Sequence, residues 1–165
     1  MRKVQRWIVL IVLTAVAAMR VGAQDSGAQP RRTVLFVCEH GTVKSLLAKV
    51  LFEQYAAEIG LDVGVVSRGT RPDSIVPAWM QFSLATDHIT LGAWRPQALT
   101  PADLQSASYV VSFDVPTSAT SGARVPRAQW DGLPSVSADY VGGRDAMRTR
   151  IHLLADSLKR AHSAR

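Results

Sequence analysis

Cysteine is nearly absent from this sequence: the 165 residues include one, Cys38. A single cysteine cannot form an internal disulfide, so a fold stabilised by disulfides within the chain is excluded. The same count excludes a redox relay between cysteines of one chain. Cys38 is therefore either a buried, inert thiol at the end of a strand or a reactive one, and the surrounding residues must decide between these two readings.

Charged residues are also scarce, at 19% of the chain, and the formal net charge of +6 is unevenly placed. Four basic residues and no acidic ones lie within positions 1–23, so the remainder carries 15 basic and 13 acidic side chains. This remainder has no basic patch with interleaved aromatic residues and no zinc-ligand spacing. We therefore expect no nucleic acid among its partners.

The first 23 residues have the pattern of a secretory signal peptide. MRKVQR is basic, WIVLIVLTAVAA is an apolar stretch of twelve residues, and VGA before Gln24 provides small residues for cleavage. The apolar stretch is short for a membrane span, although an uncleaved anchor is the alternative. We predict a signal peptide over 1–23, a flexible leader over 24–32 and one domain over 33–165, exported to the periplasm or secreted, with no membrane contact after cleavage.

Apolar residues in the predicted domain alternate between strand and helix patterns. Strands are predicted over 33–37, 61–69, 108–114 and, more weakly, 123–130, and helices over 45–60, 77–88, 100–107 and 138–162. Alternating strands and helices indicate a parallel sheet, and ligands of such sheets bind at the carboxyl ends of the strands. Cys38 lies at the carboxyl end of the first strand.

The segment from Cys38 to Ser45 is a short loop between a strand and a helix. Free backbone N–H groups and the helix dipole favour an anion at such a place, and the same surroundings favour a thiolate. Lys44 in the first helical turn opposes the dipole at a cost of about 0.3 to 1 kcal/mol, which a bound phosphate would offset and a solvated lysine would tolerate. A nucleotide-binding loop is excluded because it needs glycine where Cys38 and Val43 stand.

Residues 33–161 resemble the low-molecular-weight protein tyrosine phosphatases and the related arsenate reductases. The family signature is a strand, Cys, five residues, Arg, Ser and a helix, and it occurs here with Lys44 in the Arg position. SRGT at 67–70 is similar to the family's Ser-Ala-Gly-Thr, and RPQALTPADLQSASYVVSFD at 95–114 follows its helix and third strand. The resemblance implies a flavodoxin-like three-layer α/β sandwich with a four-stranded parallel sheet and a phosphate-binding loop after the first strand.

The resemblance also implies roles for the loop. Cys38 would be the nucleophile that forms a phosphocysteine, Lys44 would take the place of the arginine that holds phosphate, and Ser45 would support the thiolate. Lysine keeps the charge of that arginine and loses its two-pronged hydrogen bonding. The substrate would be bound by the loop residues Glu39, His40, Gly41, Thr42 and Val43.

The family takes its general acid from an Asp-Pro loop late in the chain. The matching region here is QWDGLPSVSADY, in which Pro134 is followed by Ser135. The resemblance therefore points to Asp131 as the general acid, with Asp139 as the second candidate. Asp131 also precedes a glycine, and a plain turn residue is the alternative reading.

These observations predict an enzyme that hydrolyses phosphate monoesters, phosphotyrosine among them, through a phosphocysteine and without a metal or cofactor. The expected ligands are phosphate, arsenate or a phosphorylated substrate. A non-catalytic oxyanion-binding or thiol-sensing protein remains open, as does an arsenate reductase that uses an external thiol. The sequence makes no prediction of oligomeric state.

Overall fold

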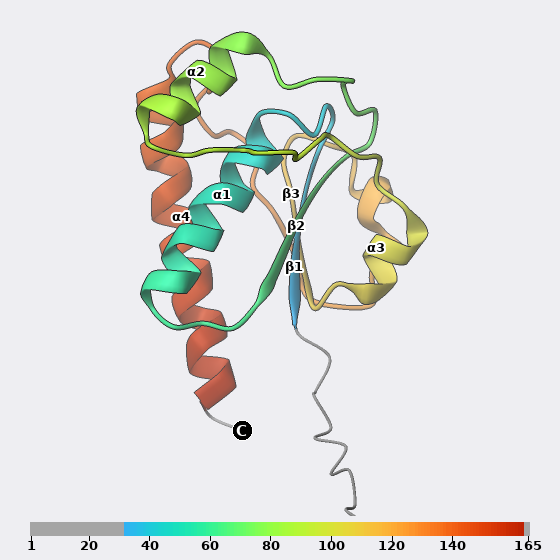
Figure 1. Ribbon diagram of the computed structural model, residues 1–165. Coiled ribbons are helices and arrows are strands. Elements are labelled where there is room, and N and C mark those ends of the chain that lie inside the picture. Colours follow the sequence, from blue (N-terminus) through green and yellow to red (C-terminus); the bar gives the residue numbers. More distant parts are fainter. Residues whose placement is uncertain (1–31, 164–165) are drawn as a thin grey trace, which may run out of the picture.

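The computed structural model describes residues 32–163 and shows one sheet between two layers of helix (Figure 1). The strands are β1 (Thr33–Cys38), β2 (Gly64–Gly69), β3 (Tyr109–Ser112) and β4 (Arg127–Gln129), all parallel and in the order β2-β1-β3-β4. The predicted four-stranded parallel sheet is thereby confirmed. The predicted signal peptide and the leader up to residue 31 lie outside the described residues.

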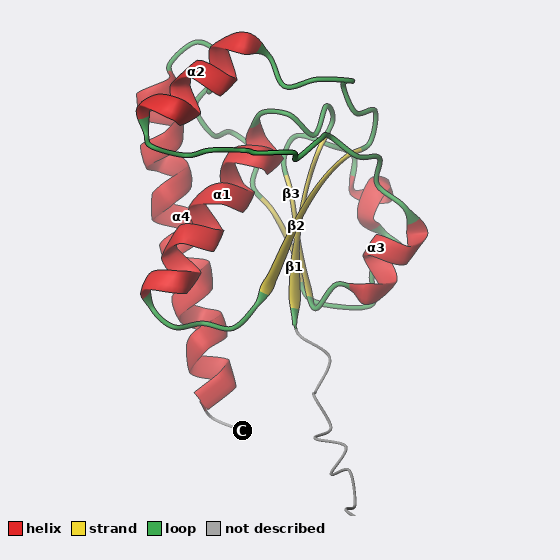
Figure 2. Ribbon diagram, in the orientation of Figure 1, coloured by secondary structure: helices red, strands yellow, loops and turns green. Residues whose placement is uncertain are grey.

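The helices cover both faces of the sheet and one of its ends (Figure 2). Helices α1 (Lys44–Glu58) and α4 (Tyr140–Ser163) lie on one face, and α3 (Pro101–Ser106) lies on the other. Helix α2 (Ala78–Thr86) lies beyond the carboxyl ends of the strands, and a short 3₁₀ helix, η1 (Thr117–Thr120), was not expected from the sequence. Within residues 32–163, no helix is long and apolar enough to cross a membrane.

Strand β1 is buried on both faces, which explains its unbroken apolar run. Val34 and Phe36 belong to the larger core beneath α1 and α4, whereas Leu35 and Val37 belong to the smaller core beneath α3. This double burial fixes the strand in the centre of the sheet. Cys38, its last residue, is therefore held at a rigid position.

The capping of α3 explains where this predicted helix begins, and it ties two elements together. Thr100 accepts a hydrogen bond from the Asp103 backbone, and the Asp103 side chain accepts one from the Thr100 backbone, with Pro101 at the first position of the helix. The Asp103 carboxylate also pairs with Arg68 at 2.9 Å. The ion pair thus links helix α3 to the carboxyl end of β2.

Helix α4 has two glycines in its first turn, and this pair obscures the start of the helix in the sequence. A Cβ atom on Gly143 would lie 2.9 Å from a methyl carbon of Val136, so glycine allows the helix to approach this segment closely. Residues 135–137 are consequently packed against the first turn of α4, beside the end of the sheet where Cys38 lies.

Candidate active site

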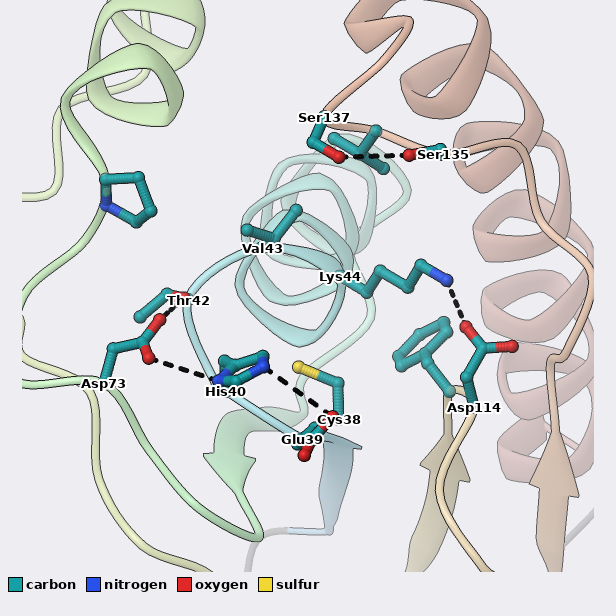
Figure 3. Close-up of a pocket in the computed structure, with 13 residues that line it drawn as sticks. Cys38, Glu39, His40, Thr42, Val43, Lys44, Asp73, Asp114, Ser135 and Ser137 are labelled. Atoms are coloured by element: carbon teal, nitrogen blue, oxygen red, sulfur yellow. Dashed lines mark hydrogen bonds and ion pairs between the residues drawn. The ribbon is translucent and has the colours of Figure 1, made fainter.

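A pocket of about 270 Å³ opens at the carboxyl end of β1 (Figure 3). Its walls come from the loop after β1, the loop after β2, the end of β3 and the segment before α4. The lining residues are Cys38, Glu39, His40, Thr42, Val43, Lys44, Asp73, Pro77, Phe113, Asp114, Ser135, Val136 and Ser137. The predicted loop residues other than Gly41 and Ser45 therefore line the pocket, together with side chains from three other segments.

The backbone of the loop is oriented by hydrogen bonds on its outer side. The carbonyl oxygens of Cys38, Glu39 and His40 each accept an N–H from residues 70–73, at 2.8 to 3.1 Å. In a planar trans peptide the N–H points away from the carbonyl, and the described residues contain no cis peptide. The N–H groups of residues 39–41 therefore point to the inner side of the loop, as an oxyanion site requires.

The thiol of Cys38 is buried and has two hydrogen-bond partners. The Ser45 hydroxyl lies 3.1 Å from Cys38 Sγ, and the Gly41 N–H donates to the same sulfur at 3.2 Å. The contact between Cys38 and Ser45 that the resemblance implied is thus present. The Gly41 N–H and the Ser45 hydroxyl can both donate to sulfur at this position. The first turn of α1 also leaves its N–H groups without a side-chain cap, because Val43, its N-cap residue, makes no side-chain cap hydrogen bond.

Two glycines allow β2 to touch the loop. Gly41 has φ of +71°, in the left-handed region where glycine carries no steric penalty. A Cβ atom on Gly69 would lie 2.9 Å from the Gly41 nitrogen and 3.0 Å from the Glu39 carbonyl oxygen. The glycine of the SRGT segment is therefore required by the close approach of two backbones.

The Lys44 side chain runs along the pocket wall to the end of β3, where its ammonium forms an ion pair with Asp114 (Figure 3). This partner was not foreseen. Lys44 is 24% exposed and Asp114 43%, so the pair is partly screened by solvent. Lys44 lines the pocket as predicted, but its charge is already matched by a carboxylate of the protein.

A second cluster of polar side chains, Thr42, His40, Asp73 and Glu39, lies on the side of Cys38 away from the Lys44–Asp114 pair (Figure 3). Thr42 donates a hydrogen bond to Asp73 at 2.7 Å, and His40 lies 3.2 Å from the same carboxylate and 3.7 Å from Glu39. Arg71 pairs with Glu39, and this hydrogen bond with its charge holds the pKa of Glu39 below the ordinary value. The loop side chains are thus linked to the segment after β2.

The two carboxylates expected to supply the acid lie outside the pocket lining. Asp131 accepts hydrogen bonds from the Asp114 backbone at 2.8 Å and from the Gln129 side chain at 2.7 Å. Asp139 accepts the Gly142 N–H at 2.9 Å, in the first turn of α4. This geometry corrects the expected placement of both residues: they support the backbone around the pocket, and neither reaches into it.

Two serines occupy the stretch of wall where the acid was expected. The hydroxyls of Ser135 and Ser137 lie 3.0 Å apart and line the pocket. Sequence reasoning missed them, and it also missed Asp73 and Asp114. Asp114 could have been found, because it is the last residue of the third predicted strand, at the end of the sheet where ligands bind. No local sequence pattern identifies Ser135, Ser137 or Asp73 as pocket residues.

Metal ligation is not indicated by this arrangement. Among the residues that the structure describes, no group of three or more His, Cys, Asp or Glu side chains could hold a metal ion. Cys38, the backbone N–H groups and Lys44 are instead suited to an oxyanion of tetrahedral shape.

Comparison with known proteins agrees with this site. The family model described as low molecular weight phosphotyrosine protein phosphatase matches residues 33–124, which include the whole loop and Asp114 but end before Asp131. No curated protein matches the sequence.

Three solved structures show the same fold. YfkJ from Bacillus subtilis gives a TM-score of 0.70 at 17% identity, over 79% of this chain and 96% of that one. The thioredoxin-dependent arsenate reductase Cg_ArsC1' from Corynebacterium glutamicum gives 0.65 at 25%, over 81% and 65%. The YwlE arginine phosphatase from Geobacillus stearothermophilus gives 0.62 at 20%, over 81% and 96%.

Proposed function

The chain belongs to the low molecular weight phosphotyrosine protein phosphatase family, and on that premise we propose that it hydrolyses aryl phosphate monoesters through a phosphocysteine on Cys38. The family and the similar structures support phosphatase or arsenate reductase activity. One observation carries the choice of chemistry. Cys38 Sγ lies in a pocket with two hydrogen-bond partners, Gly41 and Ser45, beneath a loop whose N–H groups point inward.

The reaction has two displacements at phosphorus. The Cys38 thiolate attacks, the S–P bond forms as the P–O bond of the ester breaks, and the leaving oxygen takes up a proton. Water then attacks the phosphocysteine, which releases inorganic phosphate and restores the thiolate. Loop N–H groups and the dipole of α1 hold the phosphoryl oxygens in both steps, and Lys44 and Ser45 support the anion and the thiolate respectively.

The leaving group decides the substrate class. The pocket lining offers no carboxyl group without a partner: Asp114 pairs with Lys44, Glu39 pairs with Arg71, and Asp73 contacts His40 and accepts a hydrogen bond from Thr42. An ester with a weakly basic leaving oxygen needs least help from an acid. Phosphotyrosine and other aryl phosphates meet this condition better than alkyl phosphates do, and the apolar wall of Val43, Pro77, Phe113 and Val136 suits an aromatic ring.

The deciding experiment is an assay of residues 24–165 on 4-nitrophenyl phosphate beside Cys38→Ser. We expect turnover by the wild type and none by the variant, and rapid acid quenching should trap one phosphoryl group on Cys38 by mass spectrometry. Equal activity of the two proteins would contradict the proposal. Phosphate binding without turnover in either would instead favour a non-catalytic oxyanion-binding protein.

Arsenate reduction is the second candidate, favoured by the arsenate reductase among the similar structures. Because the chain has one cysteine, an arsenate adduct on Cys38 would have to be reduced by an external thiol. Arsenite formation from arsenate with added glutathione or thioredoxin tests this candidate. If no arsenite forms under conditions where aryl phosphate is hydrolysed, arsenate reduction is contradicted and only the phosphatase proposal stands.

We also propose that the protein is exported after cleavage between Ala23 and Gln24, on the sequence pattern of residues 1–23. Intact-mass analysis of the protein produced in a secreting host should show a chain that begins at Gln24. A chain that begins at Met1 and separates with the membranes would contradict this.

A further inference from the structure

We propose that Asp114 controls oxyanion affinity: its carboxylate and a bound oxyanion compete for the ammonium of Lys44. In this view Lys44 changes partner when the pocket fills, and Asp114 sets how readily it does so. Asp114 is a positioning residue in this scheme, not a group that reacts. The inference concerns the same pocket as the proposed phosphatase activity, but it requires only that the pocket binds phosphate.

The charges around the pocket are the reason why Asp114 and a bound oxyanion would compete for Lys44. Three carboxylates line the pocket, and Lys44 is the one Lys or Arg side chain among its described lining residues. Glu39 pairs with Arg71 from outside the lining, and Asp73 contacts His40 and Thr42. The ion pair of Asp114 is with Lys44. A phosphate that enters therefore meets a cation that is already neutralised.

The carboxylate is the fixed partner in this pair. Asp114 has φ of +48°, an uncommon conformation for a residue other than glycine, and its N–H donates to Asp131 at 2.8 Å. Asp131 is in turn held by Gln129 at 2.7 Å. Lys44, by contrast, carries its ammonium on a flexible four-carbon stem. The backbone at the end of β3 is thus held in place and carries Asp114 on a short side chain, so the longer lysine side chain is the part with more freedom to move.

The exposure of the pair allows the exchange. A partly exposed ion pair contributes little net free energy, so a doubly charged ligand held by backbone N–H groups can displace one partner. After displacement Asp114 remains in the pocket wall and repels the ligand. Both effects, the loss of the pair and the repulsion, lower phosphate affinity, and together they amount to about tenfold or more for charges within one small pocket.

Asp114→Asn is a close test of the idea. Asparagine keeps the shape, removes the charge and accepts the left-handed conformation at this position, so the backbone should be preserved. We expect the Kd for inorganic phosphate, measured by titration calorimetry, to fall about tenfold. Phosphate should also protect Cys38 from iodoacetamide at correspondingly lower concentrations.

Two further variants separate competition from a general charge effect. Asp73→Asn also removes a carboxylate from the lining but does not touch Lys44, so we expect a smaller gain, about threefold or less. In a Lys44→Met background, the part of the gain that comes from the lost ion pair should disappear, because no ammonium is left to release; the part that comes from charge repulsion should remain, at about the threefold or less expected for Asp73→Asn. Circular dichroism and thermal melting establish that each variant is folded.

Several outcomes would overturn the inference. Unchanged or weaker phosphate binding by folded Asp114→Asn contradicts it, as does an equal gain from Asp73→Asn. A loss of turnover confined to esters with poor leaving groups would make Asp114 a proton donor instead. Tighter phosphate binding without turnover in any variant would support the competition while rejecting the proposed phosphatase.

Discussion

The variant Asp131→Asn tests whether Asp131 is the general acid of the reaction or a residue that only supports the backbone around the pocket. In the family to which the chain is related by sequence, an aspartate in this region protonates the leaving oxygen, and this role was expected of Asp131. The structure instead shows both carboxylate oxygens engaged, one with the Asp114 N–H and one with the Gln129 side chain. We therefore expect the variant to lose activity equally on all aryl phosphates.

The size of this loss follows from the hydrogen bonds. The amide oxygen of asparagine can still accept the Asp114 N–H, but without a full charge the bond weakens by about 1 kcal/mol. Asparagine offers an N–H₂ group where Gln129 needs an acceptor, and Gln129 retains its bond to the Val115 carbonyl at 3.3 Å. A total of about 1 to 2 kcal/mol corresponds to a fivefold to thirtyfold loss at most. Loss of a general acid would remove about 10² to 10⁴-fold.

The assay is kcat/KM on a series of aryl phosphates, from 4-nitrophenyl phosphate to phenyl phosphate. Wild type and Asp131→Asn should give parallel lines when log kcat/KM is plotted against the basicity of the leaving phenol. Asp139→Asn is the matched control, since Asp139 also accepts a backbone N–H and lies outside the pocket lining. A steeper line for Asp131→Asn, with a loss above about 10²-fold on phenyl phosphate, would refute this reasoning and restore the acid.

Three further predictions concern the framework of the site. Ser67→Ala should raise the free energy of unfolding by about 1 kcal/mol in urea titrations, because the Ser67 hydroxyl is buried without a hydrogen-bond partner among the described residues. Gly69→Ala should abolish phosphate binding, whereas Gly122→Ala, whose new Cβ would have ordinary contacts, should preserve it. Burial raises the pKa of Asp103, but hydrogen bonds from Thr100 and the Arg68 guanidinium outweigh this and leave it lowered. Its stabilising contribution should therefore be present at pH 7 and lost as the pH falls below about 4, where Asp103→Asn and wild type should unfold at converging urea concentrations.

Local patterns were sufficient to predict most of the fold. The apolar run of β1, the capping signals of α3 and the alternation of strands and helices each depend on residues close together in the sequence. The predicted helix over 45–60 ends two residues early because Gly60, with φ of +67°, leaves the helical conformation. The 3₁₀ helix η1 escaped prediction because four residues carry no usable periodicity.

The site was less predictable because its partners are distant in the chain. The loop from Cys38 to Ser45 is local, and its geometry followed from the strand, the turn and the helix. The partner of Lys44 is 70 positions away, and that of Thr42 is 31 positions away. Asp131 was placed in the pocket by sequence similarity, but the path of the chain before α4 presents Ser135 there instead. Such choices are made by tertiary packing.

The position of Lys44 at the start of α1 follows from its partner. A cation in the first turn is disfavoured by about 0.3 to 1 kcal/mol, and a partly exposed ion pair contributes about 0.2 to 1 kcal/mol. The pair with Asp114 therefore roughly offsets the dipole, and the net cost of holding Lys44 in the pocket is near zero. At this position a lysine without a partner would be disfavoured by the helix dipole. A lysine in a strong buried ion pair would not release its partner to bind a ligand. Because neither applies, a phosphate held by the loop N–H groups can take over the ammonium at the cost of one weak ion pair, about 0.2 to 1 kcal/mol, and the remaining charge of Asp114 then lowers the affinity of the pocket without abolishing it.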